Sequence, residues 1–256
     1  MKQQYRLSLD DNILVLKALA AQRPPSLFEN RYLAMLRGLH RDFGTKIHLN
    51  LYYQTAGFCL ADMPARYREE WQANADWLRL SFHALQDAPP DPYKTASYAA
   101  LAHDCTLVQS EIRRFAGEEA LSCSTTLHYC TATKQGCDAL YDCGVRNLVG
   151  LFYDFPSYHM PPETGDALRS APYIEDAQTH LRFFANDMVL NNLESAQILP
   201  ILEAKQDKRL VEIMIHEQYF HADFPFYQPD FECKLRTALQ WLTQHSFAPA
   251  FLEEIE

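Results

Sequence analysis

Two adjacent aspartates, Asp10 and Asp11, follow a short alternating segment near the start of the chain. Residues 5–10 alternate between apolar and polar side chains, the pattern of a half-buried β-strand. At a turn that leaves a strand, both carboxylates can point into one site. One could then bind a divalent metal ion while the other accepts a proton from bound water. Taken alone, Asp11 could equally cap the helix that follows it.

A histidine and an aspartate with metal-ligand spacing follow a second predicted strand. His83 ends the segment 78–83, and Asp87 comes four positions later. Residues four apart share a face on a helical turn, so an imidazole and a carboxylate placed there could bind one ion. Together with Asp11 they would supply three ligands and leave positions for water and substrate. The alternative is a loop histidine beside an aspartate that forms a turn ahead of two prolines.

Two further histidines stand at the ends of predicted strands. His216 closes the apolar segment 210–216, and His128 closes a short segment that begins at residue 125. Either histidine could transfer a proton in catalysis, and either could be a core histidine whose hydrogen bonds are satisfied. Three histidines and two aspartates at separate strand ends indicate a shared site, because titratable groups converge where catalysis takes place.

Strand-like and helix-like segments alternate along the whole chain. Further strands are predicted at 46–53, 147–153 and 249–252, helices at 11–21, 26–43, 64–77, 98–115, 133–143, 193–204 and 231–244, and a hairpin-rich insertion at 171–192. This alternation favours an α/β fold with a parallel sheet and helices outside it. The chain has no G-x-G-x-x-G or Walker loop, which favours a (β/α) barrel over a doubly wound sheet. In a barrel the active site lies at the carboxyl ends of the strands, where the residues above are placed.

The composition excludes several classes of protein. The chain has 256 residues, with 33 acidic residues against 23 lysines and arginines, and its net charge of -10 argues against nucleic acid as a partner. A hydrophobic fraction of 48% is too high for a disordered protein and allows one domain over residues 1–256. No apolar run resembles a membrane span or a signal peptide, so we expect a cytoplasmic protein without a membrane partner. The seven cysteines include no C-x-x-C pair and are expected to be free thiols.

The motifs resemble those of the polysaccharide deacetylase superfamily, and in particular an uncharacterised bacterial branch that shares the segments 77–83 and 215–219. The family consists of metal-dependent carbohydrate esterases on a distorted (β/α) barrel. The resemblance therefore implies such a barrel here, with seven or eight mostly parallel strands. In the family the first strand ends in Asp-Asp, as it does in this chain. This match implies that Asp10 is the general base and that Asp11 is a metal ligand.

Two further family motifs have counterparts in the chain, and one is missing. The family's His-x-x-x-His motif supplies two metal ligands, and His83 and Asp87 occupy its place. A histidine at the end of a late strand acts in the family as the general acid, and His216 is similar to it in position. The family's third motif carries an arginine and a proline, whereas residues 127–129 contain neither. His128 would replace this arginine or act as a further metal ligand.

Three functions from different classes fit these residues. The first is a metal-dependent hydrolase that removes an acyl group from an amide or ester of a carbohydrate or small molecule, with zinc expected before nickel, cobalt or manganese. The second is a metal-free glycoside hydrolase on the same barrel, in which Asp10 or Asp11 pairs with Glu217 or Asp187. The third is a catalytically silent barrel that binds a ligand, in keeping with the missing Arg-Pro motif and with Asp87.

Overall fold

Strands and helices alternate along the computed structural model, which describes residues 2–256. The strands are β1 (Gln4–Asn12), β2 (Ile47–Tyr52), β3 (Gln54–Thr55), β4 (Phe58–Cys59), β5 (Leu78–Ala84), β6 (Ser124–Thr125), β7 (Asn147–Gly150), β8 (Ile174–Glu175), β9 (Arg182–Ala185), β10 (Met188–Val189), β11 (Leu210–His216) and β12 (Ala248–Pro249). The helices are α1 (Leu14–Gln22), α2 (Arg31–Phe43), α3 (Arg68–Ala73), α4 (Tyr98–Phe115), α5 (Lys134–Asp142), α6 (Thr164–Ser170), α7 (Ser195–Glu203) and α8 (Phe231–Gln244). The predicted mixed α/β fold is confirmed.

Two sheets, rather than one closed sheet, carry most of the strands. In the first, the order is β10-β11-β1-β2-β5, with β12 beside β1, and all of its pairings are parallel. In the second, the order is β6-β7-β9-β8, and only β8 runs antiparallel to its neighbour. The backbone N–H of Asn186 donates to Gly150 in β7, and that of Asp187 donates to Glu212 in β11, which joins the sheets. The strands therefore form two connected, mostly parallel sheets, an arrangement consistent with a distorted (β/α) barrel.

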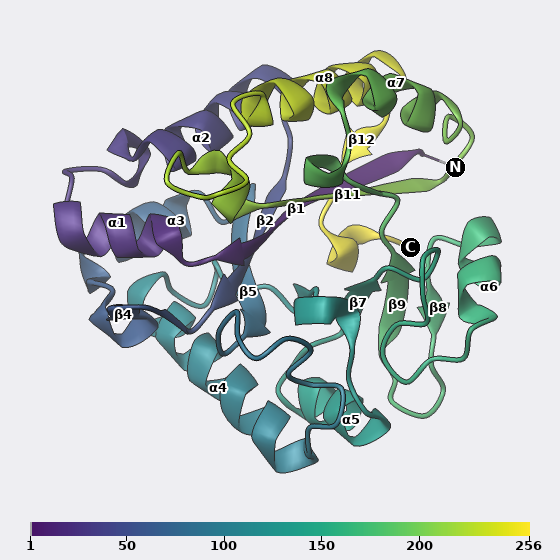
Figure 1. The fold of residues 1–256 in the computed structure, drawn as a ribbon, viewed down its shortest axis with the longest axis horizontal. Coiled ribbons are helices and arrows are strands. Elements are labelled where there is room, and N and C mark those ends of the chain that lie inside the picture. The colour runs from purple at the N-terminus through teal and green to yellow at the C-terminus, as the bar shows by residue number, and fades with distance from the viewer. Residues whose placement is uncertain (1) are drawn as a thin grey trace.

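Helices cover the outside of both sheets. Figure 1 shows α2, α7 and α8 along the top of the view and α4 and α5 along the bottom, with the strands between them. Helix α8 buries Phe231, Leu235, Leu239 and Leu242, a spacing of three and four residues that places one apolar face against the sheet. No helix in the described part of the chain is both long and apolar enough to cross a bilayer.

Side chains alternate along β1 between the apolar core and the inside of the barrel. Leu7 and Leu9 belong to the buried apolar core, whereas Arg6 and Asp10 occupy the opposite face of the strand. Arg6 donates to the carboxylate of Glu212 at 3.1 Å, and both side chains are only 1% exposed. The inside of the barrel is therefore polar along β1, with a buried ion pair near the amino end of the strand and Asp10 near its carboxyl end.

Several segments differ from their predictions, including the helix predicted at 64–77, which is shortened to α3 (Arg68–Ala73), and the last strand, which is β12 (Ala248–Pro249). Two differences have a clear physical reason. Residues 171–192 contain the antiparallel hairpin β8–β9, but β9 pairs with β7 and β10 pairs with β11, so the segment supplies barrel strands and is not an insertion. The second helix begins at Arg31 instead of following Ser26. Asn30 caps that helix, because its side chain accepts hydrogen bonds from the first free backbone N–H groups, while Ser26 caps only a short 3-10 turn.

Candidate functional site

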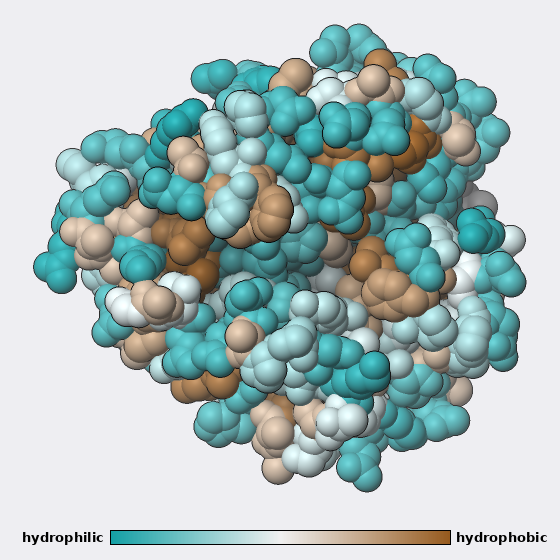
Figure 2. Space-filling view, in the orientation of Figure 1, coloured by the Kyte–Doolittle hydropathy of each residue, from teal (hydrophilic) through white to brown (hydrophobic). Residues whose placement is uncertain are grey.

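A cavity of about 360 Å³ lies at the carboxyl ends of β1, β5 and β11. It gathers the six residues predicted for a metal-dependent site, namely Asp10, Asp11, His83, Asp87, His128 and His216. Figure 2 shows this face of the molecule hollowed near its centre, with apolar residues on either side of the hollow. The expected convergence of strand-end residues is therefore present in the fold.

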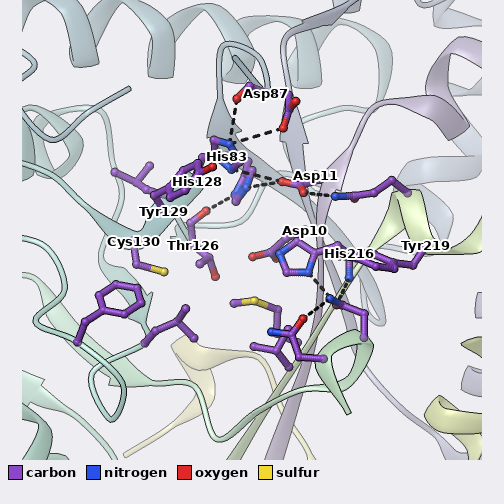
Figure 3. Close-up of a pocket in the computed structure, with 18 residues that line it drawn as sticks. Asp10, Asp11, His83, Asp87, Thr126, His128, Tyr129, Cys130, His216 and Tyr219 are labelled. Carbon is purple, nitrogen blue, oxygen red and sulfur yellow. Dashed lines mark hydrogen bonds and ion pairs between the residues drawn. The ribbon is translucent and has the colours of Figure 1, made fainter. Parts of the chain in front are cut away.

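Asp11 is the centre of the cluster at the floor of this cavity. Its Oδ1 atom lies 2.9 Å from Nε2 of His83 and 3.5 Å from Nδ1 of His128. One ligand atom from each of these three buried side chains lies within 4.8 Å of the others (Figure 3). Asp11 also has a left-handed backbone, with a φ of 61°. The strand bulges at this point, and a bulge redirects a side chain that regular pleating would point elsewhere.

The two histidines of the cluster are held in matching ways. Nδ1 of His83 donates to the backbone carbonyl of Thr126, and Nε2 of His128 lies 3.1 Å from the carbonyl of Asp87. The other nitrogen of each ring faces Asp11. It donates to the carboxylate when the ring is protonated, and it presents a lone pair to a cation when the ring is neutral. A metal-binding histidine needs this arrangement, in which one nitrogen donates outward and the lone pair of the other faces the ion.

Two further side chains bind the carboxylate of Asp11. The hydroxyl of Tyr52 donates to Oδ1 at 2.5 Å, and the amide of Gln218 donates to Oδ2 at 2.7 Å. Burial raises the pKa of Asp11, but hydrogen bonds from His128 and His83 outweigh it and hold the pKa well below its usual value. Asp11 is therefore an anion whose surroundings favour a positive charge beside it.

The charge of Asp11 also acts on its neighbours. Burial lowers the pKa of His83, yet the hydrogen bond to Asp11 outweighs burial and raises this pKa overall. Burial raises the pKa of Tyr52 strongly, and the negative charge of Asp11 raises it further, so the phenol remains a proton donor. The cluster thus has one anion, two imidazoles and a neutral hydroxyl in contact, a donor set that suits a divalent cation such as zinc.

Asp87 does not join this cluster with its side chain, contrary to the predicted ligand set of Asp11, His83 and Asp87. Its side chain is 83% exposed, and its carboxylate comes no closer than 3.8 Å to His128. The reason is local: His83 lies in β5 and Asp87 in the loop that follows, so the helical i, i+4 geometry does not apply. His128 supplies the third candidate ligand atom of the cluster.

Asp10 and His216 are neighbours in the register of β1 and β11, and both line the cavity. Nδ2 of Asn50 donates to Oδ1 of Asp10 at 2.5 Å. Nδ1 of His216 lies 2.8 Å from Oδ1 of Asn191. When Nδ1 of His216 carries a proton and donates it to Asn191, Nε2 is free to exchange a proton with a bound ligand. The pair therefore supplies an oriented carboxylate and an oriented imidazole beside the cluster of Asp11, His83 and His128, which we call the metal cluster because it could hold a metal ion.

Sequence reasoning missed Asn50 and Gln218. Asn50 has no titratable group, and the only signal for it is its place on the same face of the alternating strand 47–52 as Tyr52. Gln218 lies in the 3-10 turn Glu217–Phe220 directly after His216. Its neighbours His216 and Glu217 are titratable and were candidates, whereas a glutamine at this place has no residue type that indicates a role. Both residues contact the aspartates without being able to titrate.

The carboxylate pairs proposed for a metal-free glycoside hydrolase are not formed. Glu217 is fully buried and accepts three backbone N–H groups at the start of α1, from residues 13–15. The carboxylate of Asp187 binds Lys205 and Lys208. Neither acid lines the cavity. Both carboxylates therefore stabilise the fold. Neither Glu217 nor Asp187 supplies a second acid opposite Asp10.

No protein-family model and no curated protein matches the chain by sequence. Solved structures match 99% of its length. One is a 4-alpha-glucanotransferase from Thermococcus litoralis, with a TM-score of 0.63, 12% identity and 40% of that chain covered. Another is a CE4 family pseudoenzyme from Bacillus anthracis, with a TM-score of 0.55, 9% identity and 65% of that chain covered. A third is the Bc1960 peptidoglycan N-acetylglucosamine deacetylase, with a TM-score of 0.57, 9% identity and 88% of that chain covered.

The chain spans less than half the length of the glucanotransferase and about two thirds of the pseudoenzyme. At identities of 9 to 12% these similarities describe the fold and not the activity. They confirm the fold that the resemblance implied. The chain has the fold of the polysaccharide deacetylase superfamily, the fold of the family 4 carbohydrate esterases.

Proposed function

We propose that this chain is a metal-dependent hydrolase that removes an acyl group from an amide or ester on a carbohydrate. The observation that carries the proposal is the cluster of Asp11, His83 and His128 beside Asp10 and His216 in one cavity. A metal-ligand set, a carboxylate and an imidazole are the three components that water-driven acyl transfer needs.

The metal would be held by one carboxylate oxygen of Asp11 and by the inward nitrogens of His83 and His128. The backbone carbonyls that fix these imidazoles support the assignment, because outer hydrogen bonds set the ligating tautomer. Three protein ligands are typical of catalytic zinc, which is our expected ion. A bound divalent ion supplies polarisation of the acyl carbonyl and a lower pKa for water.

Asp10 and His216 would carry the proton transfers. Asp10 removes the proton from the attacking water, because its carboxylate is buried, oriented by Asn50 and placed at the cavity wall. His216 gives a proton to the leaving amine or alcohol through Nε2, since Asn191 occupies Nδ1. These roles agree with the resemblance, which assigns the base to the first aspartate and the acid to the late-strand histidine.

The comparison structures support a carbohydrate substrate by analogy alone. One fold neighbour is a peptidoglycan N-acetylglucosamine deacetylase, and another is a pseudoenzyme of the same esterase family. The fold is therefore shared by proteins with and without activity, and the choice depends on the residues at the site. In this chain the clustering of Asp11, His83 and His128 beside Asp10 and His216 supports an active member of the fold.

The test measures metal content and acetate release together. The purified protein, supplied with zinc, is expected to bind about one ion and to release acetate from acetylated saccharides, and a chelator is expected to abolish this release. Asp11→Asn should lose the metal, and Asp10→Asn should retain it while losing turnover. Asp76→Asn, which changes an exposed aspartate, serves as the control. A protein that binds no divalent ion, or whose turnover survives chelation, would exclude the proposal.

A further inference from the structure

Two cysteine thiols meet between helices α4 and α5. Cys105 lies within α4 and is fully buried, whereas Cys143 directly follows the last residue of α5 and is only partly buried. The two side chains hydrogen-bond to one another, and both are free thiols. Neither residue lines the cavity that holds the metal cluster. The proposed hydrolysis therefore gives this pair no role.

The sulfur atom of Cys143 rests on the turn of α4 that carries Cys105. It lies 3.7 Å from the carbonyl oxygen of Ala102 and 3.6 Å from the hydroxyl oxygen of Thr106. Positions 102 and 106 are one helical turn apart, and position 105 lies between them in the sequence, three residues after 102 and on the same side of the helix. The surface of α4 thus holds the two sulfur atoms beside each other.

The two helices are also joined at other points. The hydroxyl of Tyr98, at the start of α4, donates to the carboxylate of Asp142 at 2.7 Å. The hydroxyl of Thr133, which caps α5, donates to the carbonyl of Ala96 at 3.1 Å. Figure 1 shows α4 and α5 side by side along the bottom of the view. A bond between the sulfur atoms would therefore join elements that already pack together.

The two thiols differ in acidity and in access. The hydrogen bond from Cys105 lowers the pKa of Cys143 to about 6, and the same hydrogen bond, together with burial, raises the pKa of Cys105 well above its usual value. A surface hollow of about 450 Å³ runs along α4 and is lined by Ala102 and Thr106, the two residues in contact with the Cys143 sulfur. The pair thus combines an accessible thiol with a buried one directly behind it, as in thiol pairs that respond to oxidants.

We propose that Cys143 and Cys105 form a peroxide-sensitive thiol pair, which oxidation converts into a disulfide between α4 and α5. In the first step the sulfur of Cys143 attacks a peroxide oxygen. The S–O bond forms as the O–O bond breaks, and hydroxide leaves with the electron pair and takes up a proton, so that Cys143 becomes a sulfenic acid.

The second step uses the buried thiol. The sulfur of Cys105 attacks the sulfur of the sulfenic acid, the S–S bond forms as the S–O bond breaks, and the departing hydroxide takes the proton of Cys105 to leave as water. Counted over both steps, two thiols lose two electrons and two protons, and one molecule of hydrogen peroxide is reduced to two molecules of water.

The crosslink would join two segments that meet at His128. Helix α4 follows the loop in which the carbonyl of Asp87 contacts His128, and α5 follows the turn that carries His128. A disulfide from Cys105 to Cys143 therefore closes a covalent loop that contains a residue of the metal cluster. The thiol pair itself does not depend on the proposed hydrolase activity.

The test treats the reduced chain with hydrogen peroxide and maps its cysteines by mass spectrometry without reduction. The expected product is lighter by two hydrogen atoms and contains one crosslinked peptide pair, with Cys105 joined to Cys143, which dithiothreitol separates again. In Cys105→Ala the sulfenic acid at Cys143 should persist and react with dimedone. Cys143→Ala should lose both the crosslink and the label. Cys233→Ala, which removes an exposed cysteine on α8, is the control and should form the crosslink as the unmodified chain does.

Two results would overturn the proposal. One is a peroxide-treated chain in which Cys105 and Cys143 remain thiols while other cysteines are oxidised. The other is a crosslink that joins either of them to a different cysteine. Mapping of the unmodified chain decides between these outcomes even where a variant does not fold, and it requires neither metal nor acetate release.

Discussion

Asn50 holds Asp10 in place: its amide nitrogen lies 2.5 Å from Oδ1 of the carboxylate. The amide oxygen of Asn50 in turn accepts hydrogen bonds from the hydroxyls of Ser81 and Thr125, which fixes the orientation of the amide. The family resembled by this chain uses an arginine to orient the base. In this chain a neutral amide from β2 contacts Asp10, so the direction of this hydrogen bond orients the carboxylate.

Replacing this amide by a carboxylate should move the pH dependence of the reaction. In Asn50→Asp two acids would share one buried site, and like charges raise the pKa of the group that must ionise. We expect the acidic limb of the kcat/KM profile to shift to higher pH and kcat to fall by about tenfold or more. Asn50→Ala should lower kcat without that shift. An unchanged profile in Asn50→Asp would show that Asn50 does not orient the base.

The side chain at position 87 should be dispensable for metal binding. The carboxylate of Asp87 is exposed and lies 3.8 Å from Nε2 of His128, whereas its backbone carbonyl lies 3.1 Å from the same nitrogen. Asp87→Ala is therefore expected to bind zinc as the unmodified chain does, whereas His128→Ala should weaken binding by more than about tenfold. Competition with a chromogenic chelator measures both constants. A strong loss of zinc affinity in Asp87→Ala would instead support the predicted ligand set of Asp11, His83 and Asp87.

The buried pair below the site should make stability depend on pH. Burial raises the pKa of Glu212 to about 7, and the hydrogen-bonded Arg6 offsets only part of this effect. The unfolded chain ionises near 4.5, so between about pH 4.5 and 7 the unfolded state loses a proton that the folded state retains. The stabilising contribution of Glu212 is thus present at low pH and lost as pH rises through 7.

Glu212→Gln should remove this component of the pH dependence. Urea unfolding at pH 5 and at pH 7.5 should show a smaller fall in unfolding free energy for the variant than for the unmodified chain, by roughly 1 to 3 kcal/mol. The informative quantity is the change in unfolding free energy between pH 5 and pH 7.5, because the lost contact with Arg6 lowers stability at both pH values. An equal fall in unfolding free energy for the variant and the unmodified chain would contradict a raised pKa of Glu212.

Glu217 should matter for stability and not for chemistry. Its carboxylate accepts the backbone N–H groups of Ile13, Leu14 and Val15 at the start of α1. Glu217→Gln replaces one acceptor oxygen by a donor, which should cost about 1 to 3 kcal/mol. Thermal unfolding measures this loss, and acetate release per folded molecule should be retained. Loss of turnover with unchanged stability would instead support a catalytic acid at this position.

The sequence identified the fold and most of the site for a common reason. Period-two alternation locates strands, and parallel strands bring their carboxyl ends to one edge, so Asp10, Asp11, His83 and His216 could be grouped without a structure. Asp87 was misplaced because i, i+4 spacing brings side chains together only on a helix, and it follows a strand. Asn50 carries no charge and stands in mid-strand, so nothing in its residue type distinguishes it from a structural asparagine.

The backbone contact between Asp87 and His128 has a consequence for how this site can vary. A carbonyl oxygen is present whatever the side chain, so position 87 can accept many residues while the path of the main chain must stay the same. Insertions or deletions between β5 and α4 should therefore damage the metal cluster more than substitutions do. Part of the site is encoded by loop length, and a search by residue type would not find it.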